Sequence, residues 1–255
     1  MNRIAIIGTG HMGAPIARAL WKAGHKVAVI NRTAAKAEAL AYECPGMAVY
    51  HDAASACAGA DIVILAVKPH IILKELSKAR HACPYASFVS LAPGITLAEL
   101  EAYGANKAIR LMPNVAIDNG EGMSFLCHNA EAHADAQLLA HSLEATGRVA
   151  VVEERLFEPA MAVASCGIAY ALRYARASAE AAIALGLTPA DATSYIAQTL
   201  RGAAAMLDTG IHPEALIDSV TTPGGSTIRG LMAMERAGFS AAVAEGLTAC
   251  VSPRK

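Results

Sequence analysis

The first stretch of the chain constrains its fold most, because an apolar run leads directly into three closely spaced glycines. Ile4 to Ile7 is short, β-branched and uncharged, as expected of a strand that is buried on both faces of a parallel sheet. Gly8, Gly10 and Gly13 follow with the spacing G-x-G-x-x-G. In such a loop the first glycine makes the tight turn and the second lets the backbone approach a pyrophosphate, while the third lets the next helix pack closely. That helix would direct its free N–H groups and its positive dipole end at phosphates.

The surroundings of these glycines decide their interpretation, because glycine-rich turns are common. A helical pattern follows the loop, and a second strand is expected at Lys26 to Ile30. This order favours a dinucleotide-binding βαβ unit over an ordinary strand-to-helix turn. The predicted cofactor-binding residues of the loop are Gly8, Thr9, Gly10, His11, Met12 and Gly13.

The end of the second strand predicts which dinucleotide is bound. NAD-binding units usually have an acidic residue there for the ribose 2′-hydroxyl, whereas this chain has Asn31, Arg32 and Thr33. A neutral amide, a guanidinium and a hydroxyl suit a 2′-phosphate, so we expect NADPH to bind better than NADH. Alternatively, Arg32 is a solvated loop charge and Thr33 only caps the next helix.

The rest of the first half alternates between strands and helices. Strands are expected at residues 47–50, 61–67, 88–92, 108–112, 121–128 and 147–152, and helices at 34–42, 52–58, 71–82 and 130–145. Thr96 and Glu99 have the spacing of a capping box. Ligands of open α/β sheets bind beyond the carboxyl ends of the strands, so Ala66, Val67, Lys68 and Pro69 should border the nicotinamide half of the cleft. Lys68 could equally be a solvated lysine at a helix start.

The second half of the chain has helical periodicity only. We therefore predict two domains: residues 1–153, with a Rossmann-type, mostly parallel sheet, and residues 154–255, all helical. The composition is 55% hydrophobic and 17% charged, with a mean hydropathy of +0.37. This apolar excess favours an extensive oligomer interface over a well-packed monomer.

Several classes of protein are disfavoured. A net charge of −1 gives no electrostatic reason to bind nucleic acid or an anionic membrane. No signal-peptide pattern or long uncharged apolar run is evident, so a cytoplasmic location is expected. The six cysteines contain no C-x-x-C pair and are expected to be reduced, mostly buried thiols. No metal site is expected, because His128, His133 and His141 do not share a helical turn and no further ligands complete a set.

A second glycine-rich loop, V-T-T-P-G-G-S-T-I-R-G, extends from Val220 to Gly230. It combines two adjacent glycines with several hydroxyl residues directly before an expected helix at residues 228–237. Backbone N–H groups at that helix start, with the hydroxyls of Ser226 and Thr227, could bind a small anion such as a carboxylate. A helix connection capped by Ser226 or Thr227 is an equally good reading.

The motifs taken together resemble one family over essentially the whole chain. Besides G-T-G-H-M-G, A-V-K-P and L-M-P-N, the chain has G-E-G at Gly120 to Gly122, T-T-P-G-G-S-T in the second loop, and G-F-S-A-A-V from Gly238. This set is similar to the pyrroline-5-carboxylate reductase family, which makes L-proline. The resemblance implies an N-terminal NADPH domain and a C-terminal helical domain that forms a homodimer, possibly within a ring of dimers. It also implies substrate contacts at Thr222, Gly224, Gly225, Ser226, Thr227 and Asn114, with the Thr227 hydroxyl as the catalytic group near the ring nitrogen.

One segment departs from that pattern. Family members commonly have S-G-S-G-P-A followed by Tyr or Phe at the first long C-terminal helix, whereas this chain has A-S-C-G-I-A-Y from Ala164 to Tyr170. Ser165 replaces a glycine and Ile168 replaces the proline. The local helix start, and with it substrate selectivity or subunit packing, is therefore open.

The expected reaction requires few catalytic groups from the protein. A cyclic imine is easily protonated, and its carbon then accepts hydride from the cofactor, so the protein mainly orients the reactants. The predicted function is NADPH-dependent reduction of 1-pyrroline-5-carboxylate, with NADH the weaker cofactor. Two alternatives are a β-hydroxyacid dehydrogenase-like NADP oxidoreductase, disfavoured because no lysine occurs between Glu153 and Ala190, and a non-catalytic NADP(H)-binding sensor. Tolerance of six-membered cyclic imines and the oligomer number are not decided by the sequence.

Overall fold

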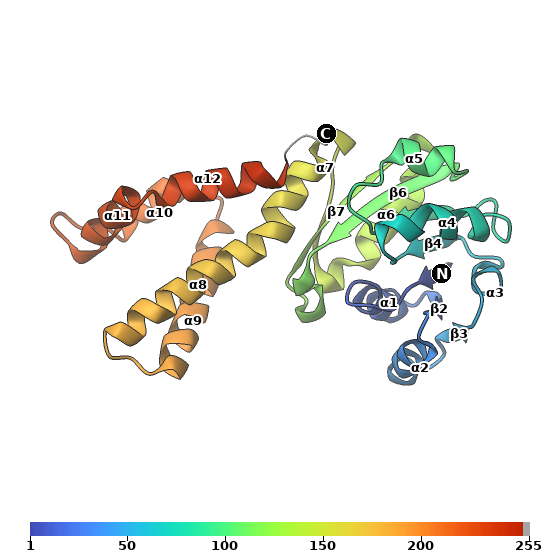
Figure 1. The fold of residues 1–255 in the computed structure, drawn as a ribbon, viewed down its shortest axis with the longest axis horizontal. Helices are drawn as coiled ribbons and strands as arrows, with labels where there is room; N and C mark the ends of the chain where they lie inside the picture. Colours follow the sequence, from blue (N-terminus) through green and yellow to red (C-terminus); the bar gives the residue numbers. More distant parts are fainter. Residues whose placement is uncertain (252–255) are drawn as a thin grey trace. The chain divides into compact units, whose positions relative to one another are not determined.

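The computed structural model describes residues 1–251, and the chain divides into two compact units, Met1–Ser165 and Cys166–Lys255 (Figure 1). Helix α7 (Glu154–Met161) lies in the first unit, because its Phe157 is buried against the sheet. The predicted boundary after residue 153 therefore precedes the division of the structure by one helix. Periodicity could not separate them, since α7 has the same helical pattern as the segments that follow it.

The first unit is built on one eight-stranded sheet. Its strand order is β3-β2-β1-β4-β5-β6-β7-β8, and the pairs from β3 to β6 are all parallel. Strand β7 pairs antiparallel with β6, and β8 pairs parallel with β7. The predicted mostly parallel, Rossmann-type sheet is confirmed, with the 3-2-1-4-5-6 order of a doubly wound fold at its centre. The strands are β1 (Arg3–Ile7), β2 (Lys26–Ile30), β3 (Ala48–Tyr50), β4 (Ile62–Leu65), β5 (Ser87–Ser90), β6 (Lys107–Pro113), β7 (Gly122–His128) and β8 (Gly147–Val151).

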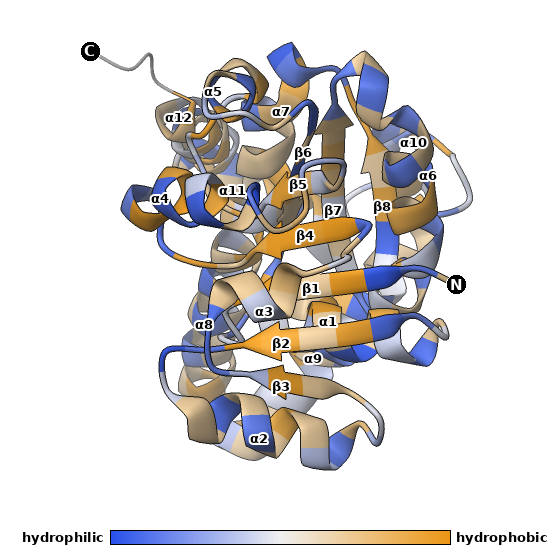
Figure 2. Cartoon of the chain, turned by 90° about the vertical axis from the view of Figure 1, so that its right-hand side faces the viewer, coloured by the Kyte–Doolittle hydropathy of each residue, from blue (hydrophilic) through white to orange (hydrophobic). Residues whose placement is uncertain are grey.

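Helices cover both faces of this sheet and enclose two apolar cores. Along β1, Ile4 and Ile6 point into one core, and Ala5 and Ile7 point into the other. Alternation of this kind buries both faces, which explains why β4 and residues 4–7 of β1 are apolar (Figure 2). Helices α1 (Gly13–Lys22), α2 (Ala34–Glu43) and α6 (His133–Ser142) contribute to the first core, whereas α3 (Ala53–Cys57), α4 (Pro69–Ala79), α5 (Leu97–Ala102) and α7 contribute to the second.

Short helical turns complete the first unit. The expected helix at residues 130–145 consists of η2 (Ala130–Ala132), α6 and η3 (Glu144–Thr146), and η1 (Val115–Asn119) follows β6. The predicted capping box is present, because Thr96 Oγ1 accepts from Glu99 N and the Glu99 carboxylate accepts from Thr96 N. A π-helical turn, Ala162–Cys166, leads out of the unit.

The second unit is entirely helical in its described part. Ala192 is the single buried residue between residues 166 and 251, and many large apolar side chains are exposed on these helices. An apolar unit without a closed core of its own is what a subunit interface leaves behind when the partner is removed. No helix within residues 1–251 is long and apolar enough to cross a membrane. The helices are α8 (Gly167–Ala184), α9 (Pro189–Leu207), α10 (Pro213–Ser219), α11 (Ser226–Arg236) and α12 (Phe239–Cys250).

Candidate active site

The first glycine loop is shaped by packing at two of its glycines and is open at the third. Gly8 has φ +106°, and a Cβ there would collide with the carbonyl oxygen of Ala66. A Cβ on Gly13 would collide with the carbonyl oxygen of Gly8. No described atom lies within 4 Å of the Cβ position of Gly10. The space beside Gly10 is therefore open, and the approach of a pyrophosphate to it stays a prediction.

Helix α1 presents an uncapped N-terminus to this space. It begins at Gly13, and Met12 in the N-cap position provides no side-chain hydrogen bond. The first turn has no acidic side chain, so the free N–H groups and the positive dipole end are not compensated by the protein. The hydroxyl of Thr9 is buried and has no partner within residues 1–251. These groups fit the diphosphate of a dinucleotide, which would accept hydrogen bonds from them.

Hydrogen bonds fasten the loop to the neighbouring strands. Gly8 N donates to Ile30 O at 2.8 Å, and Thr9 N donates to Asn31 Oδ1 at 3.1 Å. Ala66 N donates to Ile7 O at 2.9 Å. The carboxyl ends of β1, β2 and β4 thus meet at one edge, where the sequence placed the cofactor.

The residues after β2, predicted to bind a 2′-phosphate, lie at the surface. Arg32 and Thr33 are exposed, and Asn31 donates from Nδ2 to Thr33 O at 3.0 Å. Thr33 takes the N-cap position of α2, yet its hydroxyl makes no capping hydrogen bond. The hydroxyl is thus available to a ligand, and the capping alternative for Thr33 lacks its hydrogen bond.

The A-V-K-P segment follows β4 at the same edge. Ala66 and Val67 are half-buried against Gly8, whereas Lys68 and Pro69 are exposed. Lys68 is the N-cap residue of α4 and Pro69 is the first helical residue. Ala66 and Val67 therefore shape the wall of the loop, and Lys68 extends from its rim into solvent.

Asn114 has a different environment from the one expected of a substrate ligand. It is buried, and its Oδ1 accepts from Ala116 N at 3.1 Å and from Met123 N at 3.3 Å. Its Nδ2 donates to Ala164 O at 3.1 Å. Asn114 thus caps η1 and fixes the segment at Ala164, where the chain leaves the first unit. A substrate contact by its side chain stays a prediction.

The second glycine loop is described within its own unit. Gly225 N donates to Thr222 O at 2.9 Å, which closes a turn, and Gly224 has φ +68°. Helix α11 begins at Ser226, and neither a side-chain cap nor an acidic residue occupies its first turn. The hydroxyls of Ser226 and Thr227 make no capping bond, so the capping alternative is not realised. The donors left for an anion are the first N–H groups of α11, whereas the N–H of Gly225 is already used.

One buried charge cluster was missed by the sequence analysis. Arg110 on β6 is 3% exposed and pairs with Glu154 at 3.0 Å and Glu158 at 2.7 Å. Its guanidinium carbon lies 4.2 Å from the ring centroid of Phe157. These contacts hold α7 on the sheet, next to the exit of the first unit. An arginine inside the apolar run of β6 was the available signal, but its partners lie more than forty residues away.

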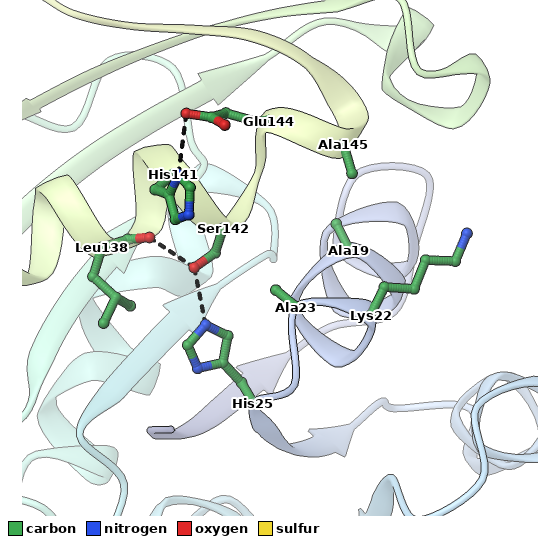
Figure 3. Close-up of a pocket in the computed structure, with 9 residues that line it drawn as sticks. All are labelled: Ala19, Lys22, Ala23, His25, Leu138, His141, Ser142, Glu144 and Ala145. Atoms are coloured by element: carbon green, nitrogen blue, oxygen red, sulfur yellow. Dashed lines mark hydrogen bonds and ion pairs between the residues drawn. The ribbon is translucent and has the colours of Figure 1, made fainter.

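A surface pocket of about 570 Å³ lies at the other edge of the sheet (Figure 3). His25 immediately precedes β2, and its Nε2 lies 2.9 Å from Ser142 Oγ, which donates to Leu138 O at 2.7 Å. Asn2 N donates to His25 Nδ1 at 3.3 Å, so the imidazole is neutral with its proton on Nε2. Burial lowers the pKa of His25, and the N-terminal amine lowers it further. The pocket is lined by Ala19, Lys22, Ala23, His25, Leu138, His141, Ser142, Glu144 and Ala145 and contains no predicted site residue.

The described residues provide neither a metal-ligand cluster nor a disulfide. Within residues 1–251, no three His, Cys, Asp or Glu side chains gather as metal ligands. All six cysteines are free, four of them buried.

Comparison with known proteins agrees with this geometry. Residues 154–255 match the family model described as pyrroline-5-carboxylate reductase dimerisation, and residues 3–94 match NADP oxidoreductase, coenzyme F420-dependent. Pyrroline-5-carboxylate reductase of Escherichia coli (strain K12) is 34% identical over 259 residues, covering 98% of this chain and 96% of that one.

Solved structures extend the comparison. A pyrroline-5-carboxylate reductase from Coxiella burnetii has a TM-score of 0.90 at 30% identity, covering 98% of this chain and 96% of that one. A Plasmodium falciparum pyrroline carboxylate reductase with NADP bound has the same fold, with a TM-score of 0.86 at 22% identity over 98% and 95% of the two chains. The fold and the open glycine loop define a Rossmann-type, dinucleotide-dependent oxidoreductase. Within that class, the chain belongs to the pyrroline-5-carboxylate reductase family.

Proposed function

We propose that this protein reduces 1-pyrroline-5-carboxylate to L-proline with NADPH. Family membership over nearly the whole chain is the observation that carries the proposal. The two uncapped helix starts support it, because one suits a diphosphate and the other a carboxylate. A cytoplasmic location belongs to the same proposal and is supported by the six free thiols.

In the proposed reaction, the two glycine-rich loops only bind and orient the reactants. NADPH, when bound, supplies the hydride. The first N–H groups of α11 bind the substrate carboxylate, and the turn of Thr222, Gly224 and Gly225 borders it. The hydroxyl of Thr227 hydrogen-bonds the ring nitrogen and orients the C=N bond. Protonation of the imine makes the ring carbon electrophilic, so no strong acid is required of the protein.

The preference for NADPH is assigned to the residues after β2. Arg32 is exposed and can form a forked contact with a 2′-phosphate, and Thr33 offers an uncapped hydroxyl. Arg32→Ala should lower the ratio of kcat/KM for NADPH to that for NADH by about 10- to 100-fold, the value of one charged hydrogen-bonded contact. An unchanged ratio would remove Arg32 from the cofactor site.

The helical unit is proposed to form the interface of a homodimer. Its match to a dimerisation model and its lack of a closed core within residues 166–251 both support this. The same surface could also join several dimers into a ring. Analytical ultracentrifugation distinguishes a dimer from a larger ring, and a stable monomer would overturn the assignment.

The activity is tested by following NADPH oxidation with cyclic imino acids of five and six ring atoms. Turnover of the five-membered substrate is the expected result, and NADPH binding without turnover would favour a sensor. Thr227→Ala should lower kcat and leave NADPH affinity unchanged, and Ser219→Ala, outside the loop, serves as the matched control. Unchanged turnover in Thr227→Ala would remove this hydroxyl from the mechanism.

A further inference from the structure

A single carboxylate oxygen joins three elements of the first unit. Oε1 of Glu154, the first residue of α7, accepts from Leu97 N at 2.8 Å and from Arg110 Nη1 at 3.0 Å. Leu97 is the first residue of α5, and Arg110 lies on β6. Three segments that are far apart in the sequence are thus held together at one atom.

Arg110 gives this carboxylate a rigid support. Its side chain is buried, and its guanidinium carbon lies 4.2 Å from the ring centroid of Phe157. Its Nη2 donates to Glu158 Oε1 at 2.7 Å. A planar guanidinium that rests on an aromatic ring and binds two carboxylates has little freedom to move. Glu154 is therefore fixed in place although its side chain is partly exposed.

Glu154 also satisfies a donor that α5 cannot satisfy within its own segment. The capping box uses the backbone N–H groups of Thr96 and Glu99. The N–H of Leu97 belongs to the first helical residue, which has no intrahelical acceptor. The Glu154 carboxylate accepts from it and places negative charge at the positive end of the helix dipole. The start of α5 thus depends on a side chain that is 57 positions away.

The segment before α5, residues 91–96, leaves the sheet at its carboxyl edge. Strand β5 pairs parallel with β4, so this segment starts at the same edge as the A-V-K-P segment. Leu91 N donates to Leu65 O at 3.2 Å, and Ile95 and Val67 pack against the same apolar core. Residues 91–96 therefore come next along the edge where the nicotinamide half of the cofactor is expected.

This segment is fixed at both of its ends. At its start, Ala92 N donates to the Oγ of the buried Ser90 at 3.2 Å. At its end, Leu97 N donates to Glu154, and Gly94 turns the chain between the two ends with φ +81°. Removing the Glu154 carboxylate would release the second end and leave the first end in place.

We propose that Glu154 is a positioning residue for hydride transfer, because it fixes residues 91–96 where they border the nicotinamide. This inference rests on the proposed function. Glu154 acts through Leu97 and the segment before it, and it supplies no group to the chemistry. The glycine loop is fixed by other hydrogen bonds, from Gly8 N to Ile30 O and from Thr9 N to Asn31 Oδ1. Loss of Glu154 should therefore disturb the orientation of the nicotinamide more than the binding of the dinucleotide.

Glu158 offers a matched control. It lies on the same helix, pairs with the same guanidinium and is 35% exposed, as Glu154 is. The N–H of Leu97, however, donates to Glu154. Glu154→Ala should lower the single-turnover rate of NADPH oxidation by about 10- to 100-fold, since small displacements of reacting groups are that costly. Its Kd for NADPH should change little. Glu158→Ala should keep the wild-type rate, although both variants lose thermal stability.

Glu154→Gln separates the position of this side chain from its charge. Its amide oxygen can still accept from Leu97 N, so the rate should return close to that of the wild type although one ion pair of Arg110 is lost. Hydrogen exchange of residues 91–97 gives a second readout that needs no turnover. It should be faster in Glu154→Ala and unchanged in Glu154→Gln and Glu158→Ala.

The outcomes distinguish this inference from the proposed function. Wild-type protein that binds NADPH without oxidising it in the presence of any cyclic imino acid would overturn the proposed function. Normal wild-type turnover with an undiminished rate in Glu154→Ala would overturn the positioning role alone. Equal slowing in Glu154→Ala and Glu158→Ala, or no recovery in Glu154→Gln, would also overturn it, because the effect would then come from the ion pairs of Arg110.

Discussion

The backbone N–H of Thr9 donates to Oδ1 of Asn31 at 3.1 Å, so the glycine loop and the end of β2 are joined by a side chain. The same amide donates from Nδ2 to Thr33 O at 3.0 Å. The sequence predicts that Asn31 contacts the cofactor, and the structure shows that its side chain supports the loop. Both oxygen and nitrogen of its amide are used, which a carboxylate could not reproduce.

This relationship predicts the effect of Asn31→Asp. The carboxylate keeps an acceptor for Thr9 N, but it places an oxygen against Thr33 O and a negative charge beside the proposed 2′-phosphate. We expect KM for NADPH to rise about tenfold or more and KM for NADH to change little, as measured by steady-state kinetics. Asn31→Ala is the control, because it removes the support without adding charge and should weaken both cofactors alike. An unaltered cofactor preference in Asn31→Asp would contradict the assignment.

Two glycines of the same loop should respond differently to a methyl group. Gly10→Ala adds its Cβ to open space, so the melting temperature should stay unchanged while the Kd for NADPH rises at least tenfold. Gly13→Ala forces a Cβ against Gly8 O and should destabilise the protein by about 1–3 kcal/mol. Thermal unfolding and fluorescence titration separate the two effects. Undiminished NADPH binding by Gly10→Ala would show that no ligand uses this space.

Neutralising both carboxylates that pair with Arg110 should destabilise the protein more than replacing Arg110 itself. Glu154→Gln together with Glu158→Gln leaves Arg110 buried without a counter-charge, and we expect a loss of about 3 kcal/mol. Arg110→Met removes the charge and leaves two carboxylates that are 35% exposed and can be hydrated, so the loss should be about 1–2 kcal/mol. Urea unfolding measures both, and the reverse order would disprove this account of the cluster.

The neutral histidine of the pocket predicts a pH dependence of stability. Folding lowers the pKa of His25 from its ordinary value of 6.5, so the unfolded chain binds a proton first as the pH falls. The stabilising contribution is therefore complete above about pH 6.5 and decreases as the pH falls below that value. His25→Gln should lose this part of the slope in melting temperature measured between pH 8 and pH 5. His141→Gln, an exposed histidine on the same pocket, should retain the slope.

Local patterns predicted most of the first unit because most of its strands are marked by apolar residues, and several are bounded by glycine, proline or charge. Strand β2 was predicted with its observed bounds, and β8 to within one residue. The antiparallel entry of β7 was not predicted, because the spacing of a strand does not reveal its direction. The packing of α7 on the sheet was not predicted either, because it depends on the burial of Phe157 and on the pairing of Arg110 with Glu154 and Glu158, which are distant in the sequence.

In the site, too, the sequence predicted the parts that consecutive residues form, but not the parts that distant residues form together. The glycine loop follows from consecutive residues, and its Gly8 and Gly13 perform the packing roles expected of them. The surroundings of Asn114 depend on Met123 and Ala164, and no local pattern specifies such distant partners.

The close fit of Gly8 beneath Ala66 O has a thermodynamic consequence. This contact, two backbone–backbone hydrogen bonds and a third from Thr9 N to the Asn31 side chain fix the loop, so its remaining N–H groups are already oriented before a dinucleotide arrives. The chain then gives up little conformational entropy on binding, and affinity depends mainly on electrostatics and desolvation. A loop preorganised in this way should show equal hydrogen-exchange protection at Gly8 and Thr9 with and without cofactor.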